Sequence, residues 1–159
     1  MSLENLGLAL QDLAIFTAVR ESALVYPAIL SLHLACLGVF GGAILSTNLR
    51  LLRWAFTGVP LEEVVRRLRP WKYVGLFIMV GCGVVIAGSN ASEYFVNPYF
   101  QTKMLLIGLV GVHGLVFRRT VYREPSRFDG TSTARVAAGL SLALWIGVLS
   151  MGRWIAYFD

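Results

Sequence analysis

The chain has 159 residues, of which 57% are hydrophobic and 14% are charged, and its mean hydropathy is +0.68. This composition is too apolar for a water-soluble domain of this length and predicts a polytopic membrane protein. Cys36 and Cys82 both lie in apolar runs and show no Cys/His spacing. They therefore argue against a disulfide framework or a cysteine metal site.

The first twenty residues predict a helix in the membrane interface. They lack a basic leader and an uninterrupted apolar core, and Glu4 and Asp12 interrupt them, so they do not resemble a secretory signal. Their leucines recur at helical spacing, at Leu3, Leu6, Leu10 and Leu13. This pattern favours an interfacial helix ahead of the first span.

Four apolar stretches follow, and they predict an all-α, integral membrane four-helix up-down bundle. The spans are expected at about residues 23–49, 73–89, 99–117 and 136–157, so that residues 1–159 form a single transmembrane domain. The first stretch carries no charge between Ala23 and Leu49. A helix of that length is about 40 Å long, more than the roughly 30 Å of the hydrocarbon core.

A separate amphipathic helix is expected in the first loop. Its apolar positions Leu61, Val64, Val65 and Leu68 follow the i, i+3, i+4, i+7 pattern, and charged residues fill the rest. Pro70 is expected to end this helix before the second span begins. Its basic face suits an anionic lipid surface better than nucleic acid.

The basic residues predict the orientation. Eleven of the fourteen lysines and arginines fall in the first and third loops. The positive-inside rule then places these loops in the cytoplasm and both termini outside a bacterial inner (cytoplasmic) membrane. The net charge of +5 therefore reports orientation, and no nucleic-acid partner is expected.

His33 is the leading candidate for a functional residue, because an ionisable side chain inside a span is costly unless it has a partner or a ligand. His113 lies in the third predicted span, at a depth similar to that of His33 when both are measured from the outer ends. Two imidazoles at one level can hold a haem iron from both faces. The alternative for each histidine is a hydrogen bond to a neighbouring span.

Lys103 and several glycines complete the predicted cofactor site. Lys103 is expected near the haem propionates, with Arg153 on the same side, although a lysine there can also snorkel to the headgroups. Four glycines are expected to form a smooth wall for the porphyrin, namely Gly38, Gly42, Gly111 and Gly114. Small residues at such spacing also allow ordinary close packing of spans.

Several runs resemble an uncharacterised bacterial family of small four-span membrane proteins. They are NLRLL, RRLRPWKYVG, NPYFQTKMLL, FRRTVYR and SLALWIGVLSMGRWIAYF, and they cover nearly the whole chain. Members of that family often carry asparagine at the position of His113, which makes His33 the firmer ligand. More distantly, His33, Lys103 in FQTKMLL and the Gly111–His113 pair resemble the HemJ-type protoporphyrinogen oxidases and the copper-resistance D membrane domains, which implies haem binding.

These observations predict a b-type haem protein that passes electrons between the quinone pool and another membrane or periplasmic redox subunit. Haem b would be held by His33 and His113 as metal ligands, and a quinone site is a further expectation. No acidic residue lies in a predicted span, so no catalytic residue is assigned and a stand-alone enzyme is not expected. Two alternatives stay open. One is a cofactor-free accessory or anchoring subunit of a larger membrane complex, and the weaker one is copper handling through His33, Met79, Met104 and Met151.

Overall fold

The computed structural model describes residues 2–121 and 123–158, and within these ranges it is helical with no strand. Four helices are long and apolar enough to cross a membrane: α3 (Val25–Leu51), α4 (Leu61–Ser89), α6 (Pro98–Thr120) and α8 (Ser132–Trp154). The short elements are α1 (Leu3–Gln11), α2 (Ala14–Glu21), α5 (Ala91–Val96), α7 (Pro125–Phe128) and the 3-10 helix η1 (Ile155–Tyr157). The predicted all-helical class with four apolar spans is confirmed.

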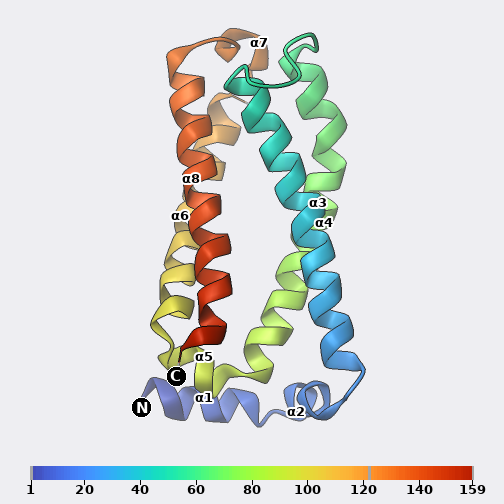
Figure 1. Ribbon diagram of the computed structural model, residues 1–159, viewed down its shortest axis with the longest axis vertical. Coiled ribbons are helices and arrows are strands. Elements are labelled where there is room, and N and C mark those ends of the chain that lie inside the picture. Colours follow the sequence, from blue (N-terminus) through green and yellow to red (C-terminus); the bar gives the residue numbers. More distant parts are fainter. Residues whose placement is uncertain (1, 122, 159) are drawn as a thin grey trace.

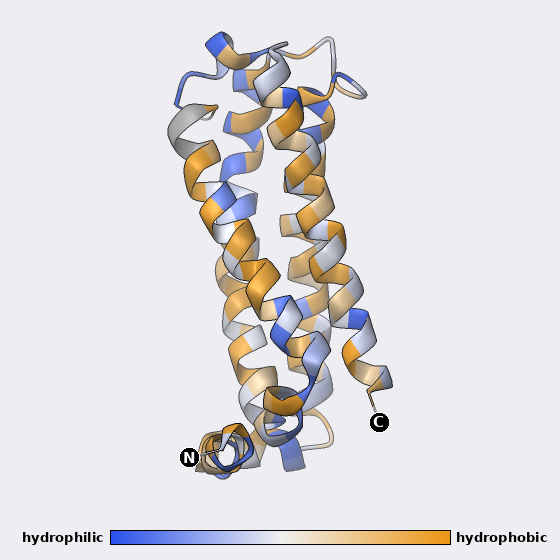
Figure 2. Ribbon diagram, turned by 90° about the vertical axis from the view of Figure 1, so that its left-hand side faces the viewer, coloured by the Kyte–Doolittle hydropathy of each residue, from blue (hydrophilic) through white to orange (hydrophobic). Residues whose placement is uncertain are grey.

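The long helices associate as two pairs. Helix α3 packs along α4, α6 packs along α8, and the pairs meet mainly where α3 contacts α8 (Figure 1). Helices α4 and α6 are not closely packed against each other over their described residues. Both termini lie at one end of the molecule, and the loops rich in arginine lie at the other. Apolar residues dominate the middle of the long helices, with hydrophilic residues gathered towards the arginine-rich end (Figure 2).

The predicted loop helix and second span are one continuous helix, so the expectation that Pro70 ends a separate helix is wrong. Pro70 lies inside α4, and the buried side of the helix continues past it, through Leu61, Val64, Gly75 and Met79. Proline removes one N–H and crowds the carbonyl four residues earlier. That carbonyl belongs to Arg66, an exposed residue, where water can satisfy it.

The N-terminal segment forms two helices rather than the single one predicted. Helices α1 and α2 lie across the end of the long helices that carries the termini (Figure 1). Gly7 is buried where α1 crosses α5, and a Cβ atom at this position would lie 2.7 Å from the Ala91 carbonyl oxygen. The crossing therefore requires a residue without a side chain.

A buried ion pair joins the two arginine-rich loops. Arg50, in the last turn of α3, donates from its two terminal nitrogens to both Asp129 carboxylate oxygens, at 3.0 and 2.8 Å. Its Nε also donates to the Val59 carbonyl oxygen at 2.7 Å. Gly130 has a φ of +81° and lies against the Arg53 guanidinium, so a side chain is excluded there as well. These contacts fix the first loop against the third.

Tyr94 of α5 provides a test of the packing at the opposite end. Burial, and secondly the nearby Tyr26, raise the pKa of the Tyr94 phenol to about 12. The ordinary value is about 10, so the folded state keeps a proton that the unfolded chain loses between these values. The contribution of Tyr94 to the free energy of unfolding is therefore expected to be fully present below about pH 10 and to be lost as the pH rises towards 12.

Ultraviolet absorbance of tyrosinate during a base titration should measure this directly. We expect one of the six tyrosines to ionise with a pKa near 12, and Tyr94→Phe to remove that late phase. A late phase that persists in Tyr94→Phe would show that another phenol is the buried one.

Candidate functional site

His33 is half-buried on the side of α3 that faces α4. Its Nδ1 lies 2.8 Å from the carbonyl oxygen of Met79. A carbonyl oxygen only accepts, so Nδ1 carries the proton and Nε2 keeps its lone pair. Nε2 has no hydrogen bond to any of the residues that the structure describes. The predicted alternative, a bond to a neighbouring helix, is thus present on one nitrogen, while the other is available to a ligand.

Two glycines of α4 allow α3 to approach closely enough for this bond. A Cβ atom at Gly83 would lie 3.2 Å from His33 Cε1, and one at Gly75 would lie 3.1 Å from the Phe40 backbone nitrogen. Each added methyl group would force α3 away from α4. Gly83 therefore provides the place for the imidazole ring, and sequence reasoning had not assigned it a role.

Lys103 is a half-buried cation on α6, directed at α8. Its Nζ would lie 3.3 Å from a Cβ atom at Gly152, and its charge is close enough to act on His33. No carboxylate within residues 2–121 and 123–158 forms an ion pair with it. Lys103 and His33 lie at similar depths, because they are five and eight residues into α6 and α3, which begin at the same end of the molecule.

Arg153 does not join them. It is exposed, donates to the Tyr157 hydroxyl at 2.6 Å, and lies over the Tyr157 ring at 4.9 Å. The Arg153 guanidinium therefore contacts Tyr157 at the surface of the molecule. The expected sharing of an anionic group with Lys103 stays a prediction, and it would require the Arg153 side chain to leave Tyr157.

His113 occupies a different level of the molecule from His33. His33 is eight residues into α3 and His113 is fifteen residues into α6, and both helices begin at the same end. The difference of seven residues corresponds to about 10 Å along the helix axis. The two imidazoles are thus not brought face to face, and the pairing stays a prediction that would need α6 to shift.

His113 instead lines a cavity of about 780 Å³ between the two helix pairs. The polar lining comes from all four long helices and the third loop, namely Asn48, Arg69, Lys72, His113, Arg123 and Ser141. Phe40, Leu76 and Trp145 supply an apolar part of the wall. The ring of Phe40 meets that of Trp145 edge-on at 5.1 Å, and both belong to the central core around Cys36 and Met79.

The predicted porphyrin wall is divided between two places. Gly111 and Gly114 line the cavity, whereas Gly38 and Gly42 lie on the exposed face of α3. A Cβ atom at any of these four would find no heavy atom within 4 Å. None of the four is therefore required for close packing within one molecule.

Sequence reasoning missed the basic side of the cavity. Arg69, Tyr73 and Leu76 are spaced four and three residues apart, so they share one face of a helix. That face is hidden if Pro70 is taken as a helix end, because Arg69 then belongs to a different element. If the helix is instead continued through Pro70, the sequence places Arg69 on the same face as Tyr73 and Leu76.

The described residues contain no cluster of three or more His, Cys, Asp or Glu side chains placed to hold a metal ion. Cys36 and Cys82 are free thiols, the first buried in the central core.

Four long apolar helices fit a protein of the multi-pass membrane class. The chain belongs to the family of unknown function DUF6644, whose model matches residues 21–158. Neither a curated protein nor a solved structure matches the chain. The resemblance to an uncharacterised membrane family thus agrees with the family found, and the likeness to HemJ-type oxidases or copper-resistance D domains gains no support.

Proposed function

We propose that this protein binds b-type haem in the membrane and carries electrons between the quinone pool and a partner redox protein. In this proposal the four long helices cross a bacterial inner membrane as an up-down bundle. Both termini lie outside, and the arginine-rich loops lie in the cytoplasm. The partner would meet the face that carries the termini.

His33 is the observation that carries the proposal. Its ring is held by Met79 on one nitrogen, and Gly83 packs against its edge. A ligating histidine is typically fixed in this way, by donating its second N–H to a carbonyl or carboxylate. In the proposal, His33 would hold the haem iron through Nε2, and the hydrogen bond to Met79 would fix the orientation of its ring.

Lys103 supports the same site. A cation beside His33, without a carboxylate partner on the described chain, fits a propionate of the macrocycle. Bound haem supplies a one-electron redox centre, and the chain supplies the ligand, the positive charge and an apolar surround that set its potential. We assign His113 to the cavity rather than to the iron, because it lies about 10 Å further along the axis.

The spectrum of the purified protein tests the proposal. We expect a Soret band in wild type that sharpens on dithionite reduction, and its loss in His33→Ala because the axial ligand is gone. His113→Ala is the matched control, since it removes the other histidine of a long helix and should keep the band. Added imidazole should restore the band in His33→Ala, which separates ligand loss from misfolding.

Two results would contradict this assignment. A colourless wild-type protein would favour the cofactor-free accessory subunit, for which the exposed and uncovered Gly38 and Gly42 offer a helix-contact face. Loss of the band in His113→Ala but not in His33→Ala would move the haem to the cavity.

A further inference from the structure

The cavity between the helix pairs has a cationic side formed by three basic residues. Arg69, Lys72 and Arg123 line it together with His113, and none of its described lining residues is acidic. Arg69 and Arg123 form no ion pair or hydrogen bond with another described residue. Their neighbours differ, because Arg66 and Arg67 are bonded to Glu63, and Arg127 is bonded to Glu124. Arg69 and Arg123 can therefore bind an anion without first breaking an ion pair among the described residues.

The opposite part of the same cavity is apolar. Phe40, Leu76 and Trp145 line it, deeper along the helices than the arginines. Helices α4 and α6 both line the cavity and are not closely packed against each other over their described residues. Its lining thus suits a molecule with an anionic head and an apolar body.

The position of the cavity in the molecule indicates which class of anionic ligand it binds. Its cationic side lies at the arginine-rich end of the long helices, where the headgroups of a bilayer would be. Basic pockets between spans on this side of a membrane bind the headgroups of anionic lipids. We propose that the cavity binds an anionic phospholipid, with its phosphate at Arg69, Lys72 and Arg123 and its acyl chains between α4 and α6.

Asn48 and Ser141 add uncharged polar groups to the wall of the cavity. Asn48 is buried, with 3% of its surface exposed, and its Nδ2 donates to the Ser141 hydroxyl at 2.9 Å. Both residues line the cavity, one from α3 and one from α8. They are hydrogen-bonding groups available to a polar part of the ligand at the arginine-rich end of the cavity. The inference is independent of the proposed haem site, because it uses neither His33 nor Lys103.

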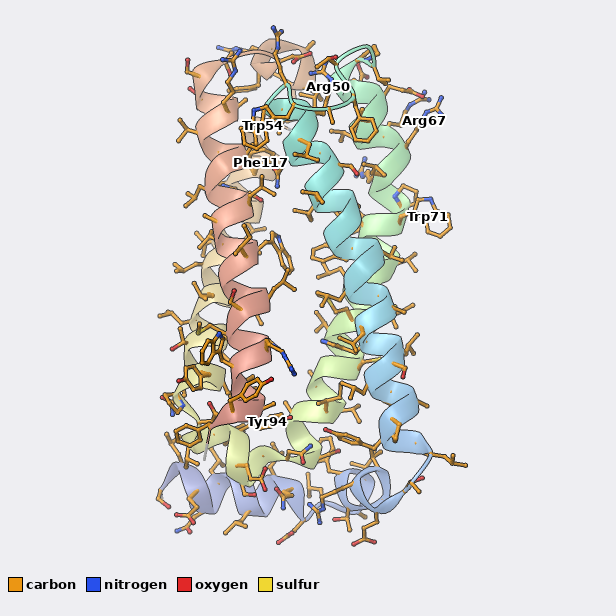
Figure 3. The ribbon with its side chains drawn as sticks, in the orientation of Figure 1. Arg50, Trp54, Arg67, Trp71, Tyr94 and Phe117 are labelled. Atoms are coloured by element: carbon orange, nitrogen blue, oxygen red, sulfur yellow. The ribbon has the colours of Figure 1, made fainter. Side chains whose placement is uncertain are left out.

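Lipid retention in native mass spectrometry tests the proposal. The full chain is equilibrated in mixed phosphatidylglycerol and phosphatidylcholine vesicles, extracted, and its bound lipid measured. We expect wild type to retain phosphatidylglycerol selectively, and Arg69→Gln/Arg123→Gln to lose at least about tenfold in retention. The matched control is Arg66→Gln/Arg67→Gln, which removes two charges from the same part of α4. Figure 3 shows Arg67 directed outward from that helix.

Each outcome of this experiment decides for or against the site. Equal losses in both double variants would show only a general surface attraction, and unchanged retention in Arg69→Gln/Arg123→Gln would remove the site. Displacement of phosphatidylglycerol by inorganic phosphate at similar concentration would mean that the ligand is a soluble anion rather than a lipid.

A second measurement does not depend on the arginine variants. Phosphatidylglycerol with brominated acyl chains quenches tryptophan only on contact, and Trp145 lies in the apolar wall of the cavity. We expect a saturable quenching component in wild type that disappears in Trp145→Phe and is absent with brominated phosphatidylcholine. Quenching that is the same for both lipids, or unchanged in Trp145→Phe, would overturn the proposal.

Discussion

Replacing Arg50 by glutamine is expected to lower the free energy of unfolding by about 3 kcal/mol, at the lower end of the range for breaking a buried ion pair. The Arg50 side chain is only 6% exposed, and it is bonded to both Asp129 oxygens and to the Val59 carbonyl. The Asp129 side chain is 26% exposed in the native structure, and the variant leaves its carboxylate without the cation. Thermal and SDS unfolding in detergent micelles, followed by tryptophan fluorescence, would measure the loss.

The control for this experiment is Arg66→Gln. Arg66 also forms an ion pair, with Glu63, but its side chain is 74% exposed, so the expected change in the free energy of unfolding is much smaller than that of Arg50→Gln. The double variant Arg50→Gln/Asp129→Asn should recover part of the loss, because it removes the stranded charge. Similar effects of Arg50→Gln and Arg66→Gln would show that the loop contact contributes little.

Replacing Gly7 by alanine is expected to detach α1 from α5. The added Cβ would lie 2.7 Å from the Ala91 carbonyl oxygen and 2.8 Å from Ser92 Cα, both of which are backbone atoms. Backbone cannot move aside as a flexible side chain can, so the cost is about 1–3 kcal/mol, paid locally. Hydrogen exchange should then be faster in α1 while the long helices keep their protection.

Gly139→Ala is the matched control, since Gly139 is also helical but a Cβ there has open space. Glycine costs about 1 kcal/mol relative to alanine in a helix interior, so this variant should be neutral or more stable. If Gly7→Ala left exchange in α1 unchanged, the crossing with α5 would not depend on the missing side chain.

Hydropathy was sufficient to predict the four long helices, because a run of apolar residues that is long enough to cross a bilayer has few alternatives. Helix ends were harder to predict. Pro70 normally terminates a helix, but the buried side of α4 runs from Leu61 to Met79, and packing against α3 offsets the lost hydrogen bond. Tertiary contacts thus overrode a local rule.

The candidate site was only partly predictable for the same reason. The sequence shows that His33 lies inside a span, but only the position of α4 shows that Met79 bonds to it. The similar depth predicted for His33 and His113 was measured from the expected outer ends of their spans. The observed helices start at Val25 and Pro98, and measured from these residues the two histidines lie at different depths. The basic cavity combines residues from four helices, and no single stretch of sequence contains that pattern.

The Arg50–Asp129 contact joins positions that are 79 residues apart. Neither hairpin of long helices contains both partners, so this contact cannot form while the nascent chain has inserted only its first two helices. The first hairpin can make its own local contacts before this long-range contact is possible. Asp129 precedes α8 in the chain, so the ion pair with Arg50 becomes available once α6 and the third loop have been made, and it then joins the first hairpin to a second one that is still being completed.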